Sequence, residues 1–241
     1  MTENTVYYGI DLALLPFRTI FGKQLRKPLR SRLQLAFRKI IGRRFTPVVG
    51  YVMDGHWHPL EIENLPSSIQ EEFTEKTRSM QGFGFRSMGI NKGNEIGSIA
   101  RYTCYFVSDD RTTSAQVGVY RITVGATSKL GWAVALRTYR KDGATLVTGN
   151  GTGAAEYLFK EYYRREYLPE TTPIARIVAR HRERLLDTPL EEIILTPDTD
   201  TLSYFIARSH EEAHGLLGSP PFRRLSDAEV ERLRRTTVNF D

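Results

Sequence analysis

The sequence is poor in cysteine and has no long apolar run. Its single cysteine, Cys104, cannot form an internal disulfide, so nothing in the chain requires an oxidising compartment. No run of about 18 apolar residues occurs, so we expect no membrane-spanning helix. The first residues lack the charged start and uninterrupted apolar core of a secretory signal. We therefore expect a cytoplasmic location, with peripheral attachment at the inner membrane face as a further possibility to test.

Most short catalytic motifs are also missing. The chain contains no P-loop, no G-x-S-x-G elbow and no Cys-x-x-Cys pair. The run from Gly149 to Ala154 has the G-x-G-x-x-A form, but it follows a predicted antiparallel hairpin rather than opening a β-α-β unit. We interpret it as a glycine-rich exit from the sheet. Cys104 lies between Thr103 and Tyr105 in a predicted strand, and we expect a small buried hydrophobe there.

Acidic residues are absent from residues 12–53, and this absence is the most informative one. The stretch is +10 and the whole chain is +6, so the remaining residues carry −4. Positive charge is therefore concentrated at one end, where it attracts polyanions over a Debye length of roughly 8 Å at physiological salt. The ten basic residues are Arg18, Lys23, Arg26, Lys27, Arg30, Arg32, Arg38, Lys39, Arg43 and Arg44.

Within this basic stretch, large apolar residues recur at helical spacing. Leu29, Leu33, Phe37, Ile40 and Ile41 fall four, four, three and one residues apart, which predicts a basic amphipathic helix over 29–41. Pro28 suits the start of that helix and Gly42 its end. Four interpretations remain open for this helix. Its apolar stripe packs on the core, or it enters an anionic membrane, or its basic residues bind nucleic acid, or it docks an acidic protein partner.

From about residue 99 the apolar period changes to two. Tyr102, Cys104 and Phe106 alternate, as do Tyr120 with Ile122 and Trp132 with Val134. Together with the Asp142-Gly143 turn, this predicts a four-stranded antiparallel meander over about 99–148 in an α+β fold. We expect Arg101, Thr103, Arg121 and Arg137 on its polar face and helices on its apolar face.

Helices are predicted on both sides of the meander. They cover about 68–80, 154–167, 173–188 and 200–217, and a last one begins at Ser226 with Glu229 at capping-box spacing. The glycine-rich residues 82–97 are predicted to be irregular. These elements suggest a basic arm at 1–46, an α+β core at 47–168 and a helical part at 169–241.

One catalytic pattern is present. His210, Glu211 and His214 fit H-E-x-x-H on a predicted helix, where the two histidines would bind zinc and the glutamate would activate water. Neither a close third ligand nor an uncharged setting accompanies it, and Glu229 or His181 would have to be brought in by the fold. A zinc-dependent hydrolase is thus one alternative function, and zinc is expected only under that alternative.

The charge asymmetry favours a non-enzymatic docking or adaptor protein. Its basic arm would hold an anionic surface, either a membrane leaflet or an acidic protein, and nucleic acid is the other alternative. The residues expected to make this contact are Arg26, Lys27, Arg30, Arg32, Arg38, Lys39, Arg43 and Arg44. No cofactor is expected for this role.

Overall fold

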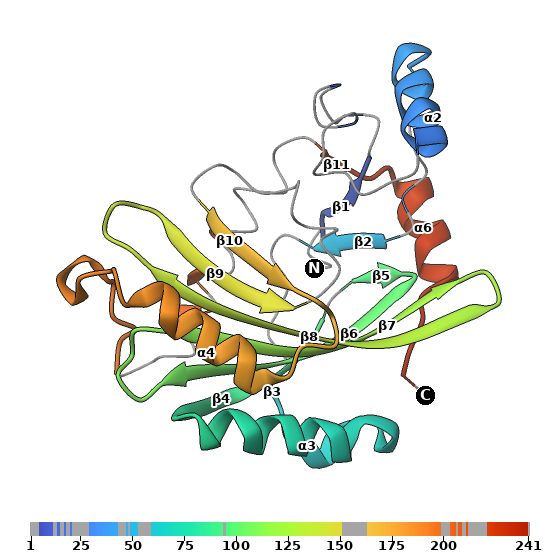
Figure 1. The fold of residues 1–241 in the computed structure, drawn as a ribbon. Coiled ribbons are helices and arrows are strands. Elements are labelled where there is room, and N and C mark those ends of the chain that lie inside the picture. Colours follow the sequence, from blue (N-terminus) through green and yellow to red (C-terminus); the bar gives the residue numbers. More distant parts are fainter. Residues whose placement is uncertain are drawn as a thin grey trace.

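The computed structural model is an α+β fold with two β-sheets (Figure 1), so the predicted fold class is confirmed. It describes residues 5–11, 14, 17, 20, 29–42, 47, 49–52, 59–93, 95–150, 163–198, 203–205, 207–208, 211 and 221–240. The predicted division of the chain at residues 46 and 168 stays a prediction.

The larger sheet has seven strands in the order β10-β9-β8-β7-β6-β4-β3. All neighbours are antiparallel except β9 and β10, which run parallel. The predicted meander corresponds to β6–β9, so it exists, but only as the middle of a larger mixed sheet. The strands are β3 (Pro59–Leu60), β4 (Phe85–Lys92), β6 (Ile99–Ser108), β7 (Ser114–Val124), β8 (Thr127–Tyr139), β9 (Thr145–Asn150) and β10 (Tyr163–Leu168).

Two helices, α3 (Ser67–Gly82) and α4 (Ile174–Leu185), cover one face of this sheet (Figure 1). Their inward side chains are almost completely buried, and each such burial contributes roughly 1.5–3 kcal/mol. They pack against alternate residues of the central strands, as a period of two requires. The helices predicted before and after the meander are thus confirmed here. The main members of this core are Ile69, Phe73, Met80, Cys104, Phe106, Val117, Val119, Val134, Leu136, Ile177 and Val178.

The smaller sheet brings the two ends of the chain together. Its order is β11-β1-β2-β5, and all of its pairs are antiparallel. Helix α6 (Asp227–Arg235) packs on it through Leu233. The predicted capping box is confirmed, because Ser226 and Glu229 bond each other's backbone N–H. The strands are β1 (Tyr7–Ile10), β2 (Val49–Val52), β5 (Ile96–Gly97) and β11 (Phe222–Arg224).

The prediction that residues 82–97 are irregular was wrong. They contain β4 and β5, and the glycines occupy special positions inside the ordered structure. Gly89 has φ +128° where the β4–β6 register shifts between Ser87 and Gly89. Gly89 therefore marks a β-bulge within β4 and does not indicate that a strand is absent.

The helix predicted over 154–167 was also wrong where the structure describes that segment. Residues 163–168 form β10, which pairs in parallel with β9 from Tyr163 opposite Thr145 to Leu168 opposite Asn150. Tyr163, Arg165 and Tyr167 share one face of this strand, but their spacing of two does not stand out in the sequence among the neighbouring aromatic residues. Residues 151–162, including most of the glycine-rich run, lie outside the described residues.

The faces of β7 are the reverse of those predicted. Val117 and Val119 point into the core, and Val119 lies opposite Tyr102 of the neighbouring strand β6. Arg121 continues that face, where its guanidinium lies 5.2 Å from the centre of the Phe240 ring. Arg121 therefore lies on the side of Tyr102 and not on the predicted polar face.

Candidate functional site

The helix predicted over 29–41 is confirmed as α2 (Leu29–Ile40). No acidic residue lies in its first turn, whereas Arg38 and Lys39 lie in its last turn, where cations interact favourably with the helix dipole. Gly42 has φ +64° and its N–H bonds the Lys39 carbonyl at 3.2 Å, as expected of a glycine that ends a helix. In Figure 1 the helix stands at the periphery, beyond the small sheet.

The burial of α2 contradicts the interpretation that its apolar stripe packs on the core. The five residues of the stripe are 44% to 72% exposed, with Ile40 the most exposed and Ile41 the least. The buried side chains are instead Leu35 and Ala36, at 3% and 7%. The helix thus turns a narrow side toward the rest of the chain and its broad apolar side outward. We call the residues Leu29, Leu33, Phe37, Ile40 and Ile41 the α2 stripe.

The α2 stripe is the main exposed apolar surface that the structure records. Of eleven large apolar side chains that are exposed among the described residues, seven belong to residues 14–41. Five of these seven form the α2 stripe, and the other two are Leu14 and Phe17. The Lys39 ammonium lies 5.6 Å from the centre of the Phe17 ring. The stripe alone exposes roughly 500 Å², about as much as the largest apolar patch on a typical monomer, and such patches commonly mark an interaction site.

The predicted anion-binding residues lie on and around this helix. Arg30 and Arg38 are exposed, while Arg32 and Lys39 are half-buried. Arg26, Lys27, Arg43 and Arg44 lie outside the described residues. Because residues 29–42 contain four basic residues and no acidic one, the α2 stripe is surrounded by positive charge.

An ion-pair cluster fixes the small sheet from which this basic end extends. Arg223 of β11 lies between two carboxylates, with Nε 3.3 Å from Asp11 and Nη2 2.5 Å from Glu229. Asp11 follows β1 and is fully buried, and its N–H donates to the Pro221 carbonyl at 2.9 Å. Hydrogen bonds from Arg223 lower the pKa of Glu229 to about 2. This cluster ties the N-terminal strand to the C-terminal strand and helix.

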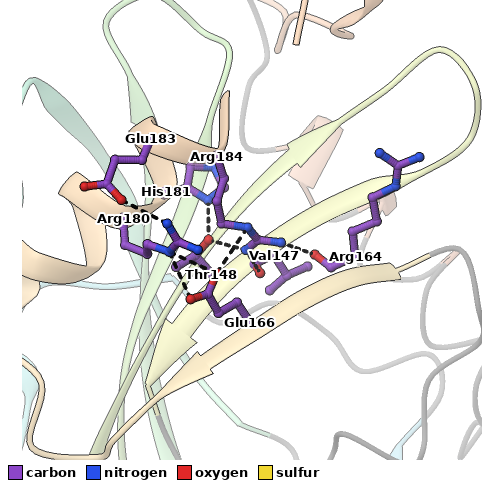
Figure 2. Close-up of polar contacts among 8 residues, drawn as sticks. All are labelled: Val147, Thr148, Arg164, Glu166, Arg180, His181, Glu183 and Arg184. Carbon is purple, nitrogen blue, oxygen red and sulfur yellow. Dashed lines mark hydrogen bonds and ion pairs between the residues drawn. The ribbon is translucent and has the colours of Figure 1, made fainter. Parts of the chain in front are cut away.

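A second polar cluster lies under α4 and is centred on His181, which is 1% exposed (Figure 2). Its Nδ1 lies 2.9 Å from Thr148 Oγ1 and its Nε2 lies 3.1 Å from Thr138 Oγ1. Arg184 can only donate, and its Nη1 lies 2.6 Å from the same Thr148 oxygen. These contacts are all satisfied when the Thr148 hydroxyl donates to Nδ1 and a protonated Nε2 donates to Thr138.

The surroundings of His181 keep its ring neutral. Burial, and to a smaller degree the nearby Arg184 charge, lowers its pKa to about 3. Glu166 of β10 accepts hydrogen bonds from Arg180 Nε at 2.9 and 3.1 Å and lies 3.4 Å from Arg184 Nε, so α4 is attached to the edge strand (Figure 2). His181 is therefore a structural link between α4, β8 and β9. Sequence reasoning placed it on the helix but could not identify its threonine partners, which come from two other strands.

Only Glu211 of the H-E-x-x-H pattern lies among the residues that the structure describes. His210 and His214 lie outside the described residues, and the exposed Glu211 accepts a hydrogen bond from Arg208 at 2.9 Å. The two suggested third ligands are engaged elsewhere, Glu229 by Arg223 and His181 by its threonines. Within the part of the chain that the structure describes, no group of three or more potential ligands is placed to hold a metal ion. The zinc site stays a prediction.

Cys104 is the small buried hydrophobe that was expected. It is 1% exposed, and its Sγ lies 3.3 Å from the Ser87 hydroxyl. Burial raises the pKa of its thiol to about 11, so the thiolate needed for nucleophilic chemistry is not formed near neutral pH.

Among the described residues, no helix is both long and apolar enough to cross a membrane. Comparison with protein-family models, with curated proteins and with solved structures finds no match to this chain.

Proposed function

We propose that the protein is a non-enzymatic docking protein that attaches to anionic membrane surfaces through α2. In this proposal the α2 stripe enters the headgroup layer and the neighbouring basic side chains contact lipid phosphates. The observation that carries it is the outward orientation of the stripe, since an amphipathic helix of a globular protein ordinarily turns that side inward.

The energies are sufficient for reversible attachment. Burying half of the stripe contributes roughly 6 kcal/mol at about 25 cal/mol per Å². Each basic side chain close to an anionic leaflet adds about 1 kcal/mol. Because the helix is already formed, binding does not have to offset the cost of ordering about 12 residues, which is on the order of 1 kcal/mol each.

The exposed apolar surface also favours a membrane over nucleic acid. Phosphate contacts with nucleic acid need only lysine and arginine, so that role gives no reason to expose five large apolar side chains on the same helix. A membrane interface uses both features together.

The test is co-sedimentation of the full chain with vesicles of phosphatidylcholine, alone or mixed with phosphatidylserine. The wild type should bind the mixed vesicles much more tightly than the neutral ones, because only the anionic leaflet adds the attraction of the basic side chains. Leu33→Ser with Phe37→Ser should weaken binding by about a hundredfold or more, since each loses roughly 1.5 kcal/mol of apolar burial. Leu130→Ser, which alters an exposed leucine in the β7–β8 hairpin, is the matched control.

A charge pair of variants completes the test. Arg30→Glu with Arg38→Glu should reduce binding at least about tenfold, because each reversal removes and opposes about 1 kcal/mol of attraction. Lys141→Glu, at an exposed position away from α2, should bind like the wild type. Equal binding of the wild type to neutral and anionic vesicles, or to neither, would refute the proposal.

A further inference from the structure

A second group of exposed leucines follows α4. Leu186, Leu190 and Leu195 are 83%, 62% and 42% exposed, and among the described residues they are three of the four large exposed apolar side chains outside residues 14–41. Leu186 directly follows the last turn of α4, and Leu190 begins a short 3-10 helix, η4 (Leu190–Glu192). We call residues 185–198 the acidic leucine segment.

The charge of this segment is opposite to that of α2. Residues 185–198 hold four acidic residues and no basic one, whereas residues 29–42 hold four basic residues and no acidic one. Glu192 and Asp198 are paired with Arg140 and Arg111. Asp187 and Glu191 are exposed, and the structure records no ion pair for either of them with another described residue. Two carboxylates therefore stand beside the exposed leucines.

The segment is held in place by bonds to the body. Ile193 is 6% exposed and forms a β-bridge with Arg140, and the Ile194 N–H donates to the Tyr139 carbonyl at 2.8 Å. Thr196 N–H donates to the Arg111 carbonyl at 2.9 Å. The leucines are thus presented on an ordered backbone, so a partner that covers them does not first have to order the chain.

The two surfaces lie at opposite ends of the molecule. In Figure 1 the end of α4 and the orange segment after it are at the left, and α2 is at the upper right. The surfaces cannot meet within one copy. Contact between two α2 stripes would bring like charges together, whereas α2 against the acidic leucine segment pairs opposite charges around two apolar surfaces.

We propose that in solution the α2 stripe of one copy docks on the acidic leucine segment of a second copy. The contact is heterologous, so each copy keeps one free donor and one free acceptor surface, and assembly is open-ended rather than limited to a dimer. The two surfaces together bury less than about 1,200 Å², which places the contact among weak and transient interfaces. It is weakened by salt, because charged groups surround it.

This contact would also regulate the proposed membrane attachment. This regulation depends on the proposed function: if α2 binds anionic lipid, then lipid and the second copy compete for the same stripe, and membrane binding disassembles the chains. Self-association itself requires no membrane, so it stands or falls on its own measurement.

Sedimentation velocity on the full chain at low salt tests the contact. The wild type should form concentration-dependent species larger than a dimer. Leu33→Ser with Phe37→Ser, and separately Leu186→Ser with Leu190→Ser, should each remain monomeric, while Leu130→Ser should assemble like the wild type. All substitutions are at exposed positions, and a thermal unfolding curve for each variant confirms that it is folded.

Mixing the two monomeric variants is the decisive step. Each retains the surface that the other has lost, so the mixture should form a one-to-one dimer and nothing larger. A mixture that stays monomeric, or a wild type that is monomeric at all concentrations, overturns the proposal. Asp187→Lys with Glu191→Lys should also abolish assembly, whereas Glu71→Lys with Glu75→Lys on α3 should not.

A vesicle arm separates this inference from the proposed function. Leu186→Ser with Leu190→Ser should bind phosphatidylserine-containing vesicles at least as well as the wild type, because only self-association is removed. If the Leu186→Ser with Leu190→Ser variant no longer assembles but still binds vesicles, both proposals are supported. Assembly without vesicle binding refutes the proposed function alone.

Discussion

The buried His181 predicts how the stability of the protein depends on pH. In the folded state its pKa is about 3, because burial and Arg184 disfavour the charged ring. In the unfolded chain a histidine has a pKa of about 6.5. Between these two values the unfolded chain binds a proton that the folded chain does not bind. The contribution of His181 is therefore fully present above about pH 6.5 and is lost as pH falls through 6.5 toward 3.

The size of the effect follows from the difference between the two pKa values. At pH 5, protonation of the unfolded chain lowers the free energy of unfolding by about 2 kcal/mol, and the decrease approaches about 5 kcal/mol near pH 3. Urea unfolding at pH 8 and pH 5 measures the first of these. For the wild type, His181 alone should account for a loss of about 2 kcal/mol over that interval.

His181→Gln isolates the contribution of this one residue. The variant is less stable at both pH values, because it loses hydrogen bonds to Thr148 or Thr138, but it has no ring to titrate. The carboxylates and the four other histidines are common to both proteins and cancel in the comparison. The variant should therefore lose about 2 kcal/mol less than the wild type between pH 8 and pH 5. Equal losses in the two proteins, or an NMR titration of the His181 ring above pH 5, would refute the reasoning.

Three further predictions follow from particular contacts. Arg223→Met should lower the free energy of unfolding by about 3 kcal/mol or more, because it leaves the fully buried Asp11 without its guanidinium; urea unfolding measures this, and a similar loss for the exposed neighbouring Arg224→Met would argue against it. Gly89→Ala should cost about 1–3 kcal/mol, because its φ of +128° is strained for any residue with a Cβ, whereas Gly82→Ala at the end of α3 should cost nothing. The Cys104 thiol should resist a disulfide reagent at pH 8 in the folded protein and react at once in urea, since it is buried and its pKa is about 11; rapid reaction without denaturant would contradict this.

The meander and the helices around it could be predicted because their signals are local. Each of these signals is formed by residues close together in the sequence. Examples are the alternation along β6 and along β8, the Asp142-Gly143 turn and the capping box at Ser226. The pairing of β1 with β11 could not be predicted in this way, since it joins residues near Tyr8 to residues near Arg224. The same is true of β10, whose place beside β9 depends on a parallel contact between separate segments.

The sequence predicted the helix of the candidate site and its docking role, but not which side of the helix is buried. The spacing of Leu29, Leu33 and Phe37 gives the helix and its amphipathic character. It does not say which side is buried, because that depends on what the rest of the fold offers. Leu35 and Ala36 form the buried side instead, and nothing in the local pattern distinguishes this arrangement from the usual one. The acidic leucine segment was not predicted either, although residues 185–198 contain four acidic residues and no basic one.

The most direct test of the proposed function measures the depth of α2 in a membrane. A fluorescent probe is attached to Phe37→Cys, and a second preparation carries it at Glu71→Cys on α3, while the buried Cys104 stays unlabelled. With phosphatidylserine-containing vesicles, the probe at position 37 should shift to shorter wavelength and be quenched by lipid-borne quenchers, and the probe at position 71 should remain in water. A probe at position 37 that stays as accessible to aqueous quenchers with vesicles as without them would contradict the account.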